Sequence, residues 1–234
     1  MKRKECLWAL GLLAAFGLWT VLVKFVDVQA IGPMGSGVGF AALNGWFHRL
    51  TGVHMALYGL TDWLGLVPVA VGFGFAVLGL VQWIDRKEIR KVDRSILMLG
   101  GFYLVVMGAY LLFEQVAINY RPVLIEGILE ASYPSSTTLL VLCVMPTARM
   151  QFARRVKKPK LRWGLCLAAG SFEMFMVTAR LVCGVHWLTD ILGGMLLSGG
   201  LVGLYGALAH GKEKRYDRKL HLPAGGGRGN SGGV

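Results

Sequence analysis

The chain has 234 residues, of which 55% are hydrophobic and only 16% are charged, and its mean hydropathy is +0.55. Soluble domains carry about a quarter of charged residues, so this composition excludes an ordinary soluble domain. The net charge of +12 would suit a nucleic-acid-binding protein, but the basic residues gather in four clusters beside apolar segments, at residues 2–4, 86–94, 149–162 and 212–228. Membrane proteins place cytoplasmic positive charge in this way, so we expect no nucleic-acid partner.

Six segments approach the ~20 apolar residues that cross a bilayer. They are residues 7–23, 64–84, 95–118, 135–152, 163–183 and 187–210. The first resembles a signal peptide, but its length and the Lys24 that follows it favour a retained span. Six spans place all four basic clusters on one side, which predicts that both termini are cytoplasmic. We therefore predict an all-α, polytopic membrane helical bundle of about six transmembrane spans in the cell membrane.

The remaining segments are assigned by composition. Between the first two spans, the Gly-rich run 32–39 is expected to be a loop, and the amphipathic stretch 40–58 an interfacial helix over the outer face. Residues 211–234 are charged and then Gly-rich, which predicts a disordered cytoplasmic tail after a membrane domain of residues 1–210. In the last span, the GxxxG step from Gly199 to Gly203 predicts close packing against another helix.

The four cysteines lie in or beside apolar segments, without the spacing of a zinc site or of a redox pair. We therefore expect no metal and no cofactor.

Polar residues at membrane depth are costly, and in this chain they gather at three places. These are the end of the third span (residues 114–122), the start of the fourth (133–138) and the junction of the fifth and sixth (180–190). The predicted topology, which was fixed by the basic clusters alone, brings all three to the outer face. Their coincidence at one level predicts a functional site there.

The residue types in these groups suit phosphoryl transfer. His186 and Asp190 are four residues apart, so a helix starting near residue 185 would place them on one face. A carboxylate beside a histidine fixes its tautomer and strengthens it as a base. Arg121 and Arg180 provide forked guanidinium groups that suit bidentate phosphate binding. The pattern predicts a phosphate site with a histidine nucleophile.

The start of the fourth span adds an anion-binding helix terminus. Ser135 and Ser136 follow Pro134, and the free backbone N–H groups of a first helical turn point at a bound anion. Each feature alone also has an ordinary structural explanation: a snorkelling arginine, a helix cap or a local i,i+4 pair. Glu173, seven residues before Arg180, is either a partner in a buried arginine network or part of a lipid groove, and we favour the structural role.

The motifs resemble those of the type 2 phosphatidic acid phosphatase superfamily, which includes bacterial undecaprenyl-diphosphate phosphatases and vanadium haloperoxidases. The family pattern is KxxxxxxRP, then PSGH, then SRxxxxxHxxxD, and the resemblance covers roughly residues 60–210. The corresponding blocks of this chain begin at Glu114, Pro134 and Ala179. The embedded site disfavours a haloperoxidase.

The resemblance implies a role for each matching residue. His186 is expected to form a phosphohistidine and Asp190 to orient it, while Arg121, Arg180 and Ser135, with the neighbouring Ser136, are expected to bind the phosphate.

Three positions depart from the family pattern: Glu114 replaces the lysine, Thr137 the histidine after PSG, and Ala179 the serine. The lost histidine is expected to protonate the leaving oxygen, a contribution of roughly 10²–10⁴-fold in rate. Two compensations are open. A neutral Glu114 could serve as the replacement acid, or the substrate could be a diphosphate, whose leaving group needs no acid.

The sequence therefore predicts a membrane phosphatase that hydrolyses a lipid phosphate or a polyprenyl diphosphate, such as undecaprenyl diphosphate, at the extracytoplasmic face. The alternative is a catalytically impaired relative that binds or moves a phospholipid. Membrane lipids are the expected partners, and the oligomeric state is not predicted.

Overall fold

The computed structural model describes the backbone of residues 2–220 and the side chains of residues 3–209. These residues are helical apart from loops, in which extended pairing is limited to isolated bridges. The helices are α1 (Lys2–Phe25), α2 (Ala41–Thr51), α3 (Met55–Leu64), α4 (Leu66–Arg86), α5 (Arg94–Gln115), α6 (Ser136–Arg155), α7 (Pro159–Val182) and α8 (Leu188–Leu220). Short 3₁₀ turns occur at Pro33–Gly35 and Ile89–Lys91. The predicted all-α class is confirmed.

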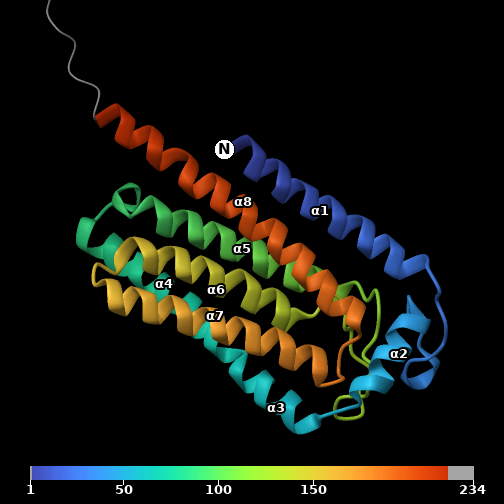
Figure 1. Ribbon diagram of the computed structural model, residues 1–234. Coiled ribbons are helices and arrows are strands. Elements are labelled where there is room, and N and C mark those ends of the chain that lie inside the picture. The colour runs from blue at the N-terminus through green and yellow to red at the C-terminus, as the bar shows by residue number, and fades with distance from the viewer. Residues whose placement is uncertain (1, 221–234) are drawn as a thin grey trace, which may run out of the picture.

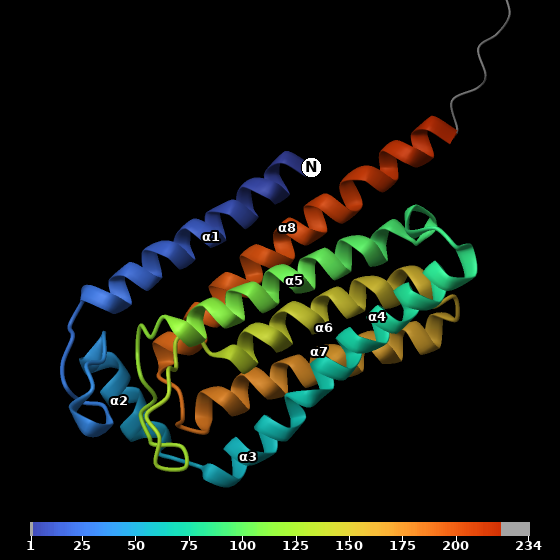
Figure 2. The same cartoon turned by 180° about the vertical axis from the view of Figure 1, so that it is seen from behind.

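The long helices lie alongside one another as a bundle, with α1 packed on α8 and α2 lying across one end (Figures 1 and 2). Five described segments are long and apolar enough to cross a bilayer: Arg3–Phe25, Met55–Arg86, Arg94–Gln115, Pro159–Val182 and Leu188–Ala209. The fourth predicted span corresponds to α6 and is less apolar than these five. It packs against α4, α5, α7 and α8, which shield its polar groups from lipid, and about six spans therefore agree with the structure.

The two ends of the bundle differ in chemistry. The basic clusters lie at the start of α1, in the α4–α5 and α6–α7 connections and near the end of α8, and Figure 1 shows all four segments at one end. The loops that carry the candidate site residues lie at the opposite end. The charge alternation predicted from the sequence therefore matches the path of the chain.

At the basic end, Asp93 ties three helices together. It accepts hydrogen bonds from Arg86 of α4 at 3.0 Å and from Arg155 of α6 at 2.8 Å, just before α5 begins. Partial burial favours its neutral form, but the hydrogen bonds donated by Arg155, Arg86 and Gln82 outweigh burial and hold the pKa of Asp93 below its ordinary value. This cluster fixes the register of α4, α5 and α6.

Small residues let α1 approach α8 closely. A Cβ atom added to Gly200 would lie 2.6 Å from Leu13 Cδ2, and one added to Gly203 would lie 2.9 Å from Ala9 Cβ. Such distances leave no room for a side chain, so the close helix contact predicted around Gly203 is present, and α1 is its partner.

The expected interfacial helix over 40–58 is divided. α2 ends at Thr51, Gly52 adopts a left-handed φ of 69°, and α3 leads into α4 at Gly65. The break is fixed by tertiary contact, because a Cβ on Gly184 would lie 1.9 Å from the Gly52 carbonyl oxygen. The end of the predicted helix therefore belongs to the second span.

The expected tail also differs from the structure at its start. α8 extends to Leu220, so residues 211–220 are helical rather than disordered. Extending an existing helix costs no nucleation, and the Lys, Glu and Arg residues of this segment are good helix formers. Residues 221–234 lie outside the described part of the chain.

Candidate active site

Loops at the end of the bundle opposite the basic clusters build the site. Between α5 and α6 the chain folds back on itself, with isolated bridges pairing Tyr120 with Ala131 and Ile125 with Ile128. The Arg121 N–H donates to the Glu130 carbonyl at 3.0 Å, which fixes Arg121 within this hairpin-like loop. The loop between α7 and α8 carries His186 to meet it.

His186 is 3% exposed and lies outside the membrane-spanning segments. Its Nε2 atom lies 3.4 Å from Arg121 Nη1 and 3.4 Å from Arg180 Nη2, while Nδ1 lies 3.8 Å from Asp190 Oδ2. Guanidinium groups only donate hydrogen bonds, so this arrangement assigns the lone pair to Nε2 and the proton to Nδ1. Burial, followed by the charges of Arg121 and Arg180, holds the pKa of His186 well below its ordinary value.

Asp190 is fully buried at the start of α8. Its Oδ2 atom accepts the Trp187 backbone N–H at 2.9 Å, and its Oδ1 atom lies 3.5 Å from the Asn119 amide nitrogen. Its backbone carbonyl accepts the Ser135 N–H at 3.1 Å, which joins the starts of α6 and α8. The predicted His186–Asp190 pair is therefore present. However, α8 begins at Leu188 rather than near residue 185, and the carboxylate reaches back to the preceding loop.

Side chains of α3 contact the two arginines of the site, Arg121 and Arg180. Arg121 is 8% exposed and Arg180 is 1% exposed, and their guanidinium carbons lie 5.9 and 5.0 Å from the centre of the Tyr58 ring. Arg180 Nη1 donates to Thr61 Oγ1 at 3.3 Å and lies 3.9 Å from Asp62 Oδ1. None of these three α3 residues was predicted as a site residue from the sequence, although their spacing of three and four places them on one helix face.

Arg121 also has an acidic partner, the side chain of Glu130. Arg121 Nε lies 2.9 Å from Glu130 Oε2, and the Glu130 side chain is 40% exposed. This contact follows from the fold of the α5–α6 loop and has no signature in the sequence.

The start of α6 places its serines differently from one another. Ser135 caps the helix and is fully buried, and its Oγ atom accepts the Thr138 hydroxyl at 3.0 Å. Ser136 lines a small pocket beside His186, and Thr137 is partly buried in the first turn. The phosphate-binding roles of Ser135 and Ser136 stay predictions.

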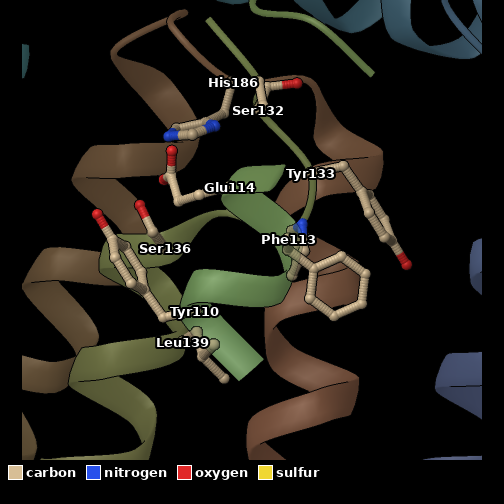
Figure 3. A pocket seen from close by; sticks show the side chains of 10 residues that line it. Tyr110, Phe113, Glu114, Ser132, Tyr133, Ser136, Leu139 and His186 are labelled. Carbon is tan, nitrogen blue, oxygen red and sulfur yellow. The ribbon is translucent and has the colours of Figure 1, made fainter. Parts of the chain in front are cut away.

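The pocket beside His186 also contains Glu114, from the last turn of α5 (Figure 3). Its enclosed space is about 10 Å³, enough for a single water-sized group. Figure 3 shows the Glu114 carboxyl group turned toward the His186 ring, with the hydroxyl groups of Tyr110 and Ser136 pointing the same way. α5 ends at Gln115, so Arg121 does not continue its helix, but both residues nevertheless reach His186.

Glu173 has a partner other than Arg180. It lies 3.2 Å from Arg149 Nη2 of α6, in the middle of the bundle. This contact fits the structural role that we favoured and separates Glu173 from the site. Ala179 is 5% exposed and lies beside Arg180 on α7.

The site contains several carboxylates, but among the described residues no group of three or more His, Cys, Asp or Glu side chains is arranged to hold a metal ion. The arrangement instead offers one histidine with a free lone pair between two fixed cations. Such a site can bind a tetrahedral anion and attack it.

Comparison with known proteins bears on the same residues. Residues 100–213 match the family model of the PAP2 superfamily. The matched range includes Glu114, Arg121, Arg180, His186 and Asp190, and the predicted resemblance is confirmed. α1, α2, α3 and α4 lie outside it.

One similar solved structure is described as the first transmembrane PAP2 type phosphatidylglycerolphosphate phosphatase from Bacillus subtilis. It is 18% identical, the similarity covers 92% of this chain and 98% of that chain, and the TM-score is 0.49. A search of curated proteins returned no match.

Proposed function

We propose that this PAP2 protein is a membrane lipid phosphatase that acts through a phosphohistidine at His186. The observation that carries the proposal is the position of the His186 Nε2 atom, 3.4 Å from each of two guanidinium groups, with Asp190 on the Nδ1 side. A phosphoryl group held by Arg121 and Arg180 would lie against this lone pair. All three side chains are buried, which limits the access of bulk water to the nucleophile.

The reaction follows in two balanced steps. The Nε2 lone pair attacks phosphorus, the bond from phosphorus to the leaving oxygen breaks, and the Nδ1 proton faces Asp190, which stabilises the positive charge that develops on the ring. Water then attacks phosphorus, the electron pair of the P–N bond returns to Nε2, and both protons of the water leave with the phosphate as dihydrogen phosphate. The two arginines neutralise the charge on the phosphoryl oxygens in both steps.

An apolar groove supports a lipid substrate. It has about 440 Å³ of space and is lined by Leu57 of α3 and by α7 residues from Met174 to Val182. Leu57 and Ala179 line the groove, and their sequence neighbours Tyr58 and Arg180 contact each other beside His186. The segment from Met174 to Val182 covers eight helical steps, or about 12 Å, so a hydrocarbon chain bound here would extend into the bilayer from a headgroup at His186.

The distribution of charge supports an extracytoplasmic site in the cell membrane. The basic segments lie at the end of the bundle opposite His186, and positive charge marks the cytoplasmic side. The threonine at position 137 supports a diphosphate over a monoester, because a departing phosphate needs less protonation than an alkoxide. A polyprenyl diphosphate is therefore the substrate class that we expect to be hydrolysed fastest.

One observation favours the second candidate, a relative that binds phospholipid without turnover. Glu130 and Asp62 already contact the two arginines, and an anionic substrate must displace or share these contacts.

Release of phosphate from farnesyl diphosphate and from dioleoyl phosphatidate by purified wild-type protein and His186→Ala in detergent tests the two proposals. We expect release by the wild type alone, and faster from the diphosphate. Equal release by both proteins would exclude His186, and lipid binding without release by either would support the second candidate.

A further inference from the structure

The motif resemblance aligns Glu114 with the lysine of the family pattern, and its side chain lines the same pocket as His186. In Figure 3 the carboxyl group is turned toward the imidazole from the opposite side of the pocket. A carboxylate in a phosphate site repels the substrate if it is ionised, so its presence there requires a reason. A neutral carboxylic acid has the reverse effect, because it donates a hydrogen bond to a phosphoryl or leaving oxygen.

The direction of attack gives the carboxyl group its place in the reaction. In an in-line displacement the leaving oxygen lies opposite the nucleophile, across phosphorus. A phosphoryl group at His186 Nε2 therefore directs its leaving oxygen away from the ring, toward the wall of the pocket that Glu114 forms. In the family pattern the usual acid is the histidine after PSG, and the motif resemblance aligns Thr137 with it. A hydroxyl group is too weak an acid to replace that histidine.

The surroundings suit a proton donor. Tyr110 lies one turn before Glu114 on α5, and its hydroxyl and that of Ser136 line the pocket beside the carboxyl group. These hydroxyls can hold the carboxyl group in the pocket without adding charge.

We propose that Glu114 is the catalytic acid and base of this site, an inference that rests on the proposed phosphatase function. As the P–O bond breaks, the carboxyl proton passes to the leaving oxygen and leaves a carboxylate. As water attacks the phosphohistidine, the carboxylate takes a proton from that water and regains its acid form. One residue thus replaces both the lysine and the histidine of the family pattern.

Leaving-group dependence tests the assignment, because removal of an acid slows departure of a poor leaving group more than that of a good one. Glu114→Gln keeps the shape of the side chain and cannot donate a carboxyl proton. We expect it to lower turnover of dioleoyl phosphatidate roughly 100-fold or more, and that of farnesyl diphosphate about threefold or less. Thermal unfolding in detergent checks that the variant is folded.

Glu130→Gln is the matched control, since Glu130 contacts Arg121 from the α5–α6 loop. It removes a negative charge from the same site, and we expect equal changes on the two substrates. Three results would each overturn the assignment. Glu114→Gln could lose equal activity on both substrates, or it could keep its phosphatidate turnover unchanged. Alternatively, wild-type protein that hydrolyses the diphosphate could show no phosphatidate turnover. A different result would reject the proposed function, namely turnover that persists in His186→Ala.

Discussion

Substitution of Arg180 by lysine tests whether the site needs a fork of donors or only a positive charge. The Arg180 guanidinium points Nη2 at His186 Nε2, donates from Nη1 to Thr61, and lies 5.0 Å from the Tyr58 ring centre. Lysine keeps the charge but is a single compact donor without a planar face. A lysine at this position therefore cannot donate to Thr61, stack on the Tyr58 ring and bind a phosphate at the same time.

The size of the effect follows from these contacts. One lost hydrogen bond from a charged donor costs about 1.5–3 kcal/mol, and weakened stacking on the Tyr58 ring adds about 1 kcal/mol. A total of about 2.5–4 kcal/mol corresponds to a loss of roughly 70- to 900-fold in kcat/KM.

Steady-state release of phosphate from farnesyl diphosphate in detergent measures this loss. Arg149→Lys is the matched control, because Arg149 pairs with Glu173 in the middle of the bundle and is 40% exposed. We expect the control to stay within about threefold of wild type. A value for Arg180→Lys within the same range would refute the assignment of Arg180 as a forked phosphate ligand.

Three further predictions concern other features. Tyr58→Leu removes the ring against both arginines, and we expect KM to rise about tenfold with a smaller change in kcat, as steady-state kinetics would show. Because the pKa of His186 is lowered, its Nε2 atom stays unprotonated at pH 6.5, where an ordinary histidine is half charged. Phosphoenzyme formation in rapid-quench experiments should therefore not fall between pH 7.5 and about 6, and a midpoint near 6.5 would contradict this. Gly200→Leu places a side chain against Leu13 and Ala9, and we expect thermal unfolding in detergent at a temperature several degrees lower, whereas an unchanged temperature would contradict the close α1–α8 contact.

The sequence predicted those parts of the site that depend on local spacing. At most ten residues separate Arg180, His186 and Asp190. They lie at the end of α7, in the following loop and at the start of α8, so the short connection limits how they can meet. The basic clusters predicted the two ends of the bundle because charge in short loops has a strong energetic preference for one side.

Other features depend on contacts between distant segments. Tyr58 reaches the site because the chain breaks at Gly52, and Gly52 breaks where it does because Gly184 packs on its carbonyl group. The contact of Arg121 with Glu130 likewise depends on the fold of a loop. No local pattern in the sequence reports such contacts, which only the assembled bundle defines.

The central claim is the phosphohistidine, and direct trapping tests it. The protein would be mixed with farnesyl diphosphate that carries ³²P at the terminal phosphate, quenched in alkali within milliseconds, and digested for mass spectrometry. We expect an acid-labile, alkali-stable label on His186, which is absent from His186→Ala. A label on another residue, or phosphate release at the wild-type rate by His186→Ala, would contradict it.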